Sequence, residues 1–251
     1  MAAAIEPTSE DALLGGQLVL RQPLRGHRFG HDAVLLAAAT PARTGEHAIE
    51  VGAGVGAAGL ALARRVAGLT VTLVEVDPSL AALARENAAR NLLSERVRAV
   101  CLDAGAPAAQ FAAAGLHPGC ADHVLMNPPF NAPHNPSPDR ARRLARAAAP
   151  GALVQWIQTA ARLLRADGNL TLIWRADGLA DVLAALTAGF GAVAIVPVYP
   201  KPQAAAIRVV IRATRNSQAP LALLPGLILA GSDNKPTPQA EAILRDGAAL
   251  G

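Results

Sequence analysis

Short apolar runs alternate with longer segments of helical periodicity along most of the chain. A short apolar run bounded by turn residues is typical of a buried strand, and apolar residues at spacings of three and four indicate a helix. Strands are predicted at 48–51, 71–74, 97–102, 122–126 and 169–174, and helices at 55–67, 78–91, 106–114, 153–164 and 179–187. This alternation predicts a doubly wound, Rossmann-like α/β fold with a mostly parallel sheet.

The two ends of the chain depart from this alternation. Residues 16–23 predict a strand and 32–40 a short helix before the main fold begins, and 238–244 predict a short final helix. Strands predicted at 192–198 and 207–213 have no helix between them, which indicates an antiparallel edge strand in a seven-stranded sheet. No linker or repeat divides the sequence. We therefore expect one domain over 1–251, with an N-terminal segment (1–45), a core (46–215) and a C-terminal extension (216–251).

Composition excludes several classes of protein. Hydrophobic residues make up 52% and charged residues 17% of the chain, which favours a packed core over disorder. The net charge of +4 and the pI of about 9.8 suit a nucleic-acid partner, or a genome that uses Arg in place of Lys. Cys101 and Cys120 lack CxxC spacing, and His117, His123 and His134 lack ligand spacing, so we expect no metal site.

Neither end of the chain predicts contact with a membrane. The first residues carry Glu6, Glu10 and Asp11 and lack the basic start and apolar run of a signal peptide. The apolar stretch 221–231 is about half of a membrane span and contains Pro225. We expect a soluble, cytoplasmic protein.

A glycine cluster follows the first core strand. Gly52, Gly54 and Gly56 allow the backbone to turn tightly and approach a ligand, and the next helix points its N–H groups at that ligand. Gly54, Gly56 and Gly59 also form a literal GxGxxG, the pattern of dinucleotide-binding loops. However, Glu50 just before the cluster would repel a pyrophosphate. A carboxylate there suits a ligand with an ammonium group, such as the methionine part of S-adenosyl-L-methionine.

Acidic residues also end the next two strands. Glu75 is placed to accept hydrogen bonds from both ribose hydroxyls of a nucleoside. Asp77 precedes Pro78, which predicts that it caps the following helix instead. Asp103 ends the third strand and could reach an adenine amino group. Each acid alone could be a solvated strand end, but three after successive strands together favour a nucleoside site.

The fourth strand runs into Asn127-Pro128-Pro129-Phe130. A proline-rich turn would explain this sequence, but its position at a carboxyl strand end beside the predicted cofactor indicates chemistry. The Asn127 side-chain oxygen and the Pro128 carbonyl can accept both N–H bonds of a conjugated amine, which directs its lone pair at an electrophilic methyl group. Prolines fix this geometry before substrate arrives. Phe130 can stack on a flipped-out base, and no strong general base is needed.

These segments together resemble the tRNA (adenine-N6) methyltransferase family, relatives of the enzyme that modifies adenosine 37 of a valine tRNA. The resemblance covers nearly the whole chain, through LVLRQPLRGHRFGHDAVLLAAA, EVGAGVG, VEVDP, NPPF, LLRADGNLTLIWRADGL and TPQAEAILRDGAAL. It implies the class I methyltransferase fold, S-adenosyl-L-methionine as cofactor and N6-methylation of an adenosine in tRNA. In that family the N-terminal segment lies over the cofactor, so Arg28 and Asp32 are expected to touch it.

The NPPF motif specifies the chemistry better than the substrate, because DNA adenine, rRNA guanine and protein glutamine methyltransferases share it. Release-factor glutamine methyltransferases carry a helical N-terminal domain, and only residues 1–51 precede the glycine cluster here, too few for one. An RNA substrate predicts a basic surface, although solvated helix faces would show the same charges. The candidate phosphate contacts are Arg140, Arg142, Arg143 and Arg146, with a later group of Lys201, Arg208, Arg212 and Arg215.

The sequence leaves open two functions from other classes of protein. An NAD-dependent oxidoreductase would use the GxGxxG, but the chain offers no Tyr-Lys or His candidate near the strand ends, and Tyr199 is its one tyrosine. A non-catalytic RNA-binding protein could keep the fold, but Glu50, Glu75 and Asn127 are all intact. The pattern specifies neither the tRNA and nucleotide nor the oligomeric state.

Overall fold

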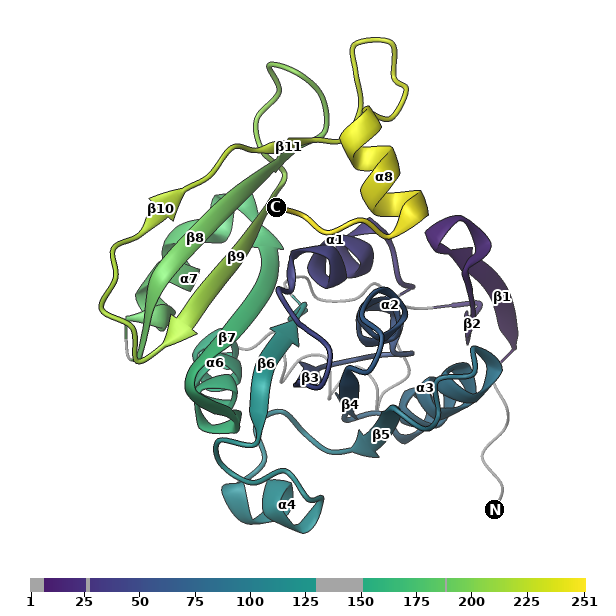
Figure 1. The fold of residues 1–251 in the computed structure, drawn as a ribbon, viewed down its shortest axis with the longest axis vertical. Coiled ribbons are helices and arrows are strands. Elements are labelled where there is room, and N and C mark those ends of the chain that lie inside the picture. Colours follow the sequence, from purple (N-terminus) through teal and green to yellow (C-terminus); the bar gives the residue numbers. More distant parts are fainter. Residues whose placement is uncertain (1–6, 26–27, 130–150, 188) are drawn as a thin grey trace.

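A nine-stranded sheet forms the centre of the computed structural model, which describes residues 7–25, 28–129, 151–187 and 189–251. The strand order is β10-β8-β9-β7-β6-β3-β4-β5, with β11 also paired to β8 (Figure 1). The strands are β3 (His47–Val51), β4 (Thr70–Glu75), β5 (Val97–Cys101), β6 (Ala121–Met126), β7 (Leu164–Arg175), β8 (Phe190–Tyr199), β9 (Arg208–Arg215), β10 (Ala222–Leu223) and β11 (Leu227–Ile228).

The pairing confirms the doubly wound, mostly parallel α/β fold and corrects two details of it. β5, β4, β3, β6 and β7 are parallel neighbours, whereas β9 is antiparallel to both β7 and β8. The antiparallel strand therefore lies inside the sheet and not at its edge, because β9 returns from β8 through a short turn and enters between β8 and β7. The sheet has nine strands and not seven, since β10 and β11 are two-residue strands that leave no periodicity in the sequence.

Helices cover both faces of the sheet. One face carries α1 (His31–Ala39), α2 (Ala57–Arg65) and α3 (Pro78–Arg90), and the other carries α4 (Ala108–Ala113), α6 (Ala152–Leu163) and α7 (Leu179–Leu186). Alternate residues of a strand point to opposite faces. Accordingly, Leu73 of β4 belongs to the α1–α2 core and Val74 to the core that contains Phe111 and Trp156.

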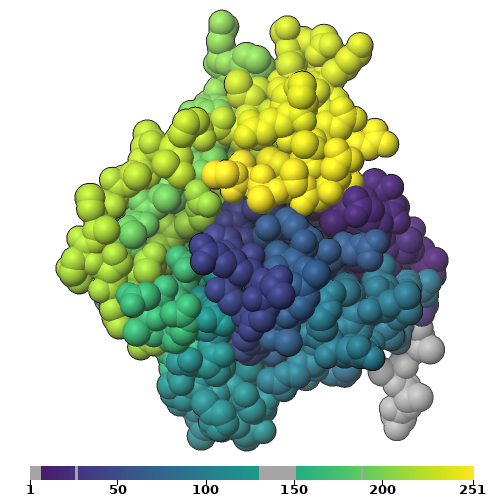
Figure 2. All heavy atoms as spheres, viewed as in Figure 1, coloured from purple at the N-terminus to yellow at the C-terminus, as the bar shows by residue number. Residues whose placement is uncertain are grey.

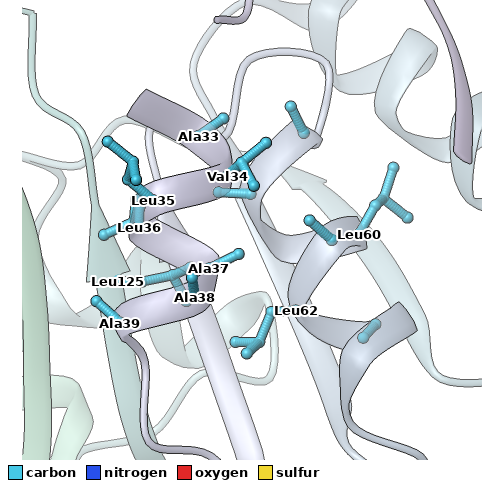
Figure 3. Packing of buried hydrophobic residues seen from close by; sticks show 14 of the residues in the cluster. Ala33, Val34, Leu35, Leu36, Ala37, Ala38, Ala39, Leu60, Leu62 and Leu125 are labelled. Atoms are coloured by element: carbon cyan, nitrogen blue, oxygen red, sulfur yellow. The ribbon is translucent and has the colours of Figure 1, made fainter. Parts of the chain in front are cut away.

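α1 is apolar on all sides and buried on all sides. Residues 33–39 are all buried, as expected of a helix without a polar face. Leu62 of α2 lies beside it, whereas Leu60 points to the other side of α2, and Leu125 of β6 lies beneath α1 (Figure 3). α8 (Pro238–Asp246) also packs against α1, and the Leu250 N–H donates to the Ala38 carbonyl at 2.9 Å. The C-terminal residues thereby complete the cover of α1.

A hairpin precedes α1, formed by β1 (Thr8–Leu13) and β2 (Leu18–Pro23) around the 3-10 turn η1 (Leu14–Gly16). β1 was not expected, because its residues are mostly polar. Asn87 of α3 and Asn91, which caps the C-terminus of that helix, bind β2 as a neighbouring strand would. Asn87 accepts from Arg21 N–H at 2.7 Å and donates to Arg21 O at 2.9 Å, and Asn91 makes the same pair of bonds to Val19 at 3.0 and 2.9 Å.

Two kinds of feature are absent from the described residues. No helix there is both long and apolar enough to cross a membrane. Within the same residues, no group of three or more His, Cys, Asp or Glu side chains is arranged to hold a metal ion.

Candidate functional site at the carboxyl edge of the sheet

The loops that follow β3, β4 and β6 leave the sheet side by side. Val51 is in register with both Val74 and Met126, so these three strands end at the same level. The first loop is fastened to β4, because the N–H groups of Gly52 and Ala53 both donate to the Val74 carbonyl, at 2.9 and 3.0 Å. The predicted cofactor loop and the Asn-Pro-Pro motif therefore share one edge.

The three glycines of the first loop have left-handed backbones but different surroundings. Gly52, Gly54 and Gly56 have φ angles of +73°, +56° and +88°. A Cβ on Gly52 would lie 2.4 Å from the Trp156 ring, and one on Gly56 would lie 2.8 Å from Leu73. A Cβ on Gly54 would meet nothing within 4 Å. Gly52 and Gly56 thus serve internal packing, while the backbone at Gly54 faces open space that a ligand can enter.

Glu50 is a buried carboxyl group below this loop. It is 4% exposed, and its Oε2 accepts the Gly59 N–H at 2.7 Å in the first turns of α2. Its pKa is raised from 4.5 to about 8, chiefly by burial and in smaller part by the nearby charge of Glu75, while the hydrogen bond from Gly59 opposes the shift. A cation placed beside it would favour the charged form.

Gly59 completes the literal GxGxxG but does not leave a donor for a pyrophosphate. Its N–H is bound to the protein's own Glu50 carboxyl group. A Cβ there would lie 2.4 Å from Leu73 and 2.8 Å from Glu50 Oε2. The glycine is therefore explained by the close approach of α2 to β3 and β4.

Glu75 links the loops after β3 and β4. Its Oε2 accepts the Gly54 N–H at 2.8 Å and its Oε1 accepts the Asp77 N–H at 2.9 Å. Burial raises the pKa of Glu75, and these two hydrogen bonds oppose the shift. Asp77 itself accepts from Ser79 N–H at 2.9 Å and from Leu80 N–H at 3.4 Å, which confirms that it caps α3. Each Glu75 oxygen retains capacity for a further hydrogen bond from a ligand.

Asp103 is exposed in the loop after β5, where its Oδ1 accepts the Gly105 N–H at 2.8 Å. α6 supports this loop from below. Thr159 donates to the Ala104 carbonyl at 2.8 Å, and Gln155 donates to the Gly105 carbonyl at 3.4 Å. These contacts of Gln155 and Thr159 were not predicted, because periodicity predicts a helix at 153–164 but not the loops that its side chains reach.

Asn87 is a second supporting residue that the sequence analysis missed. Besides its bonds to β2, its Nδ2 donates to the Val55 carbonyl of the glycine loop at 3.0 Å. The side chain is fully buried. A buried polar residue on an otherwise apolar helix face was the available signal, because such a group is normally hydrogen-bonded.

Asn127 follows β6 directly, and its side-chain oxygen has no partner among the described residues. The oxygen is buried, Pro128 is buried and Pro129 is half-buried. An amide oxygen buried without a hydrogen bond costs about 1–3 kcal/mol. Such a group is expected where a ligand supplies the missing donor. Phe130 and the basic residues Arg140, Arg142, Arg143 and Arg146 lie outside the described residues.

Arg28 and Asp32 are each held in an ion pair. Arg28 contacts Asp11 of β1 at 2.8 Å, and Asp32 in the first turn of α1 contacts Arg208 of β9 at 2.9 Å. All four side chains are partly exposed. A ligand contact by either residue would therefore be made beside an existing partner.

The later basic group does not gather on one surface. Arg208 and Arg215 are the first and last residues of β9 and so lie at opposite edges of the sheet. Arg215 donates to the Leu164 carbonyl, and Arg212 donates to the Gly251 carbonyl at 3.5 Å. Lys201 lies in the turn between β8 and β9, at the edge where the candidate site is.

A hollow of about 300 Å³ lies at the opposite edge, where β3, β4 and β5 begin. Part of its polar lining is already hydrogen-bonded: His47 contacts Thr72 Oγ1 at 3.0 Å and the Cys120 carbonyl at 2.9 Å, and Arg98 donates to Thr72 at 3.2 Å. It therefore offers less to a ligand than the carboxyl edge. There, two buried acids, the open backbone at Gly54 and the unpartnered amide oxygen of Asn127 fit a nucleoside cofactor with a cationic group.

Comparison with known proteins agrees with this geometry. A family model described as the methyltransferase small domain matches residues 28–199. A tRNA1(Val) (adenine(37)-N6)-methyltransferase of Tolumonas auensis is 30% identical over 64% of this chain and 65% of its own, and one of Porphyromonas gingivalis is 33% identical over 62% and 61%. These matches span less than two thirds of each relative's length.

Solved structures show the same fold. A predicted O-methyltransferase of Agrobacterium tumefaciens superposes with a TM-score of 0.75 at 29% identity, over 87% of this chain and 98% of its own. TrmN of Thermus thermophilus has a TM-score of 0.51 at 22% identity, over 73% and 47%, which supports the fold alone. Because the family model spans most of the chain, this protein belongs to the methyltransferase small domain family and has the class I methyltransferase fold.

Proposed function

We propose that the protein transfers a methyl group from S-adenosyl-L-methionine to the N6 atom of an adenosine in tRNA. The observation that carries the proposal is the buried, unpartnered Asn127 oxygen, which follows β6 at the edge shared with Glu50, Gly54 and Glu75. The names of the relatives from Tolumonas and Porphyromonas support the choice of adenosine in tRNA. One domain over 1–251 and a cytoplasmic location stay predictions.

The cofactor would be held by the loops after β3, β4 and β5. Glu75 would accept the ribose hydroxyls, and the glycine loop with Glu50 below it would receive the methionine part. Asp103 is proposed to contact the adenine amino group, and Arg28 and Asp32 to contact the cofactor from the N-terminal side. When bound, S-adenosyl-L-methionine supplies an electrophilic methyl group on a sulfonium.

The chain's part in the reaction is to orient a weak nucleophile. Asn127 Oδ1 and the Pro128 carbonyl would accept the two N–H bonds of the amine, which leaves its lone pair free to attack the methyl carbon. The hydrogen bonds from the amine to both acceptors would strengthen as positive charge grows on the nitrogen. They would therefore stabilise the transition state more than the bound substrate. The new N–C bond would form as the methyl–sulfur bond breaks, which would leave S-adenosyl-L-homocysteine, and the amine proton would then pass to solvent. Phe130 is proposed to stack on the extruded base, and the arginines at 140–146 to contact phosphates.

The proposal is tested by methylating unmodified tRNA with isotopically labelled cofactor and identifying the labelled nucleoside by mass spectrometry. We expect labelled N6-methyladenosine with the wild type and a large loss with Asn127→Ala. The same assay is run in parallel with rRNA and with a release-factor peptide. Label on guanosine in the rRNA, or on glutamine in the peptide, in place of tRNA adenosine would show that the proposed substrate is wrong. Calorimetry with S-adenosyl-L-methionine and with NAD tests the cofactor, and tight NAD binding would reject the methyltransferase mechanism.

A further inference from the structure

Lysine occurs at two positions in this chain, Lys201 and Lys235. Arginine occupies every other position that carries a Lys or Arg residue. Each lysine is followed by a proline, Pro202 or Pro236. A composition that uses arginine nearly everywhere makes the location of two lysines informative. They are 34 positions apart in the sequence, and nothing in the sequence pattern brings them together.

The structure places the two lysines on adjacent turns. Lys201 lies in the turn after β8, and Lys235 lies in the turn between β11 and α8. The bases of these turns are hydrogen-bonded: Leu229 N–H donates to Tyr199 O at 2.8 Å, and Ala230 N–H donates to Pro200 O at 3.1 Å. Figures 1 and 2 show both turns projecting at the same end of the molecule, the first in green and the second in yellow.

Each turn is fixed by its own hydrogen bonds. In the second turn the Gly231 N–H donates to the Lys235 carbonyl at 2.8 Å, and the Lys235 N–H donates to Asp233 Oδ1 at 3.0 Å. In the first turn the Ala204 N–H donates to the Lys201 carbonyl at 3.3 Å. A residue that precedes proline is also restricted to extended conformations. The backbone of both lysines is therefore set before any ligand binds, which lowers the entropic cost of contact.

Both ammonium groups are available to a ligand. Lys201 and Lys235 are exposed, and neither has an ion-pair partner within the part of the chain that the structure describes. Asp233 lies in the same turn as Lys235 and brings one negative charge there. The other lysine turn, residues 200–207, carries no acidic residue.

These turns lie at the same edge of the sheet as the candidate site. β8 and β7 both run antiparallel to β9, so β8 ends at the edge where Asn127 follows β6. In the order β6-β7-β9-β8, three strand spacings of about 4.8 Å separate β8 from β6 laterally, or about 14 Å. The register places Ile195 of β8 level with Met126, so Lys201 also lies up to about 17 Å beyond Asn127 along the strand direction, or roughly 22 Å in all. A nucleic acid whose base is bound at Asn127 could reach this distance within a few nucleotides.

We propose that Lys201 and Lys235 form a lysine pair that binds the phosphate backbone of the RNA substrate a few nucleotides from the methylated base. The inference rests on the proposed tRNA substrate. Lysine is a compact, rotatable point charge and binds phosphate without a fixed fork geometry. Such contacts position a nucleic acid without reading its sequence.

The scarcity of lysine gives a direct test in the wild-type protein. Acylation with an amine-reactive reagent, followed by peptide mass spectrometry, reports on these two side chains and the amino terminus. Saturating unmodified tRNA is expected to slow acylation at both lysines severalfold, whereas S-adenosyl-L-methionine alone is expected to change neither. Equal acylation with and without bound tRNA would overturn the proposal.

A variant tests the energetics. Lys201→Ala with Lys235→Ala is expected to raise the KM for tRNA about 5- to 20-fold, since two exposed ion pairs are lost. The salt slope of log binding constant should fall by about 1.4–1.8. The kcat and the cofactor Kd should stay at wild-type values, and the double Lys→Arg variant should restore tRNA binding. Arg43→Ala, an exposed arginine before β3 at the opposite edge, is the matched control.

The outcomes separate this inference from the proposed function. If the wild type methylates tRNA and the double alanine variant keeps its KM and salt slope, the lysine pair is wrong and the function stands. If the wild type methylates no RNA, both are wrong. Loss of folding in the variant leaves the acylation experiment on the wild type as the deciding measurement.

Discussion

Cofactor binding is expected to release a proton from Glu50. The carboxyl group is buried, and its pKa of about 8 means that at pH 7 about ten molecules in eleven are protonated before binding. The ammonium group of the cofactor, which we propose the glycine loop above Glu50 to receive, would favour the ionised form. Ionising Glu50 at pH 7 then costs about 1.4 kcal/mol, a factor of about ten in affinity.

This linkage predicts a definite pH profile. The Kd for S-adenosyl-L-methionine should fall about tenfold between pH 6 and pH 7 and level off above pH 8. Calorimetry at pH 7 in two buffers of different ionisation enthalpy should report release of about 0.9 proton. The Glu50→Gln variant should bind more weakly above pH 8, with little pH dependence and little proton release. Absence of proton release from the wild type, or an unchanged profile in the variant, would refute the reasoning.

The same group affects the stability of the cofactor-free protein. Because the folded-state pKa of Glu50 is raised from 4.5 to about 8, the folded state holds the proton more tightly than the unfolded state. The resulting stabilisation is fully present below about pH 4.5 and is lost as the pH rises through about 8. The Tm of the wild type should therefore fall relative to that of Glu50→Gln between pH 6 and pH 9.

Four further changes test other parts of the structure. Asn127→Ala should lower the single-turnover methylation rate about 100- to 1,000-fold with a nearly unchanged cofactor Kd. Asn127→Asp keeps the hydrogen-bond acceptor and should be partly active. A wild-type rate in the alanine variant would mean that the Asn-Pro-Pro motif is only a structural turn. Glu75→Ala should weaken cofactor binding in calorimetry by about 1–3 kcal/mol, and an unchanged Kd would exclude it from the ribose site. Asn87→Ala should lower the free energy of unfolding by about 2–4 kcal/mol in urea titrations, because a buried hydrogen bond to Val55 and two partly buried ones to Arg21 are lost. Replacing Arg142 and Arg143 by Ala should reduce the salt slope of RNA binding by about 0.7–0.9 for each phosphate contact, and an unchanged slope would make them a solvated face.

Elements with a strong repeating pattern were predictable from the sequence. The parallel strands contain short, mostly apolar runs between helical segments, and Asp77 followed by Pro78 is a recognisable helix start. β1 was missed because Thr8 to Asp11 are all polar and show no alternation of apolar and polar residues. β10 and β11 contain two residues each, too few to show a period. The position of β9 inside the sheet depends on whether β8 or β9 of the antiparallel pair lies next to β7. The alternation of apolar runs and helical segments in the sequence does not determine this.

The site was predictable where topology alone brings residues together. Glu50, Glu75 and Asn127 end parallel strands, and parallel strands end at one edge. Contacts made across helices were not predictable, because the Trp156 ring reaches Gly52 only through the packing of α6 on the sheet. The later basic group, Lys201, Arg208, Arg212 and Arg215, does not form one basic surface because of the length of β9. An extended strand advances about 3.4 Å per residue, so the ends of β9 lie more than 20 Å apart.

The place of β9 also constrains the order in which the sheet can be completed during synthesis. β8 is made before β9, yet in the finished sheet it meets β7 only through β9. A nascent chain that ends before residue 208 can pair β5, β4, β3, β6 and β7 in their final order, but β8 then has no neighbour in the sheet. The two lysine turns meet later still, since the second follows β11, which pairs with β8. The proposed cofactor loops therefore belong to the part of the sheet that can assemble early, and the end proposed to contact RNA is completed last.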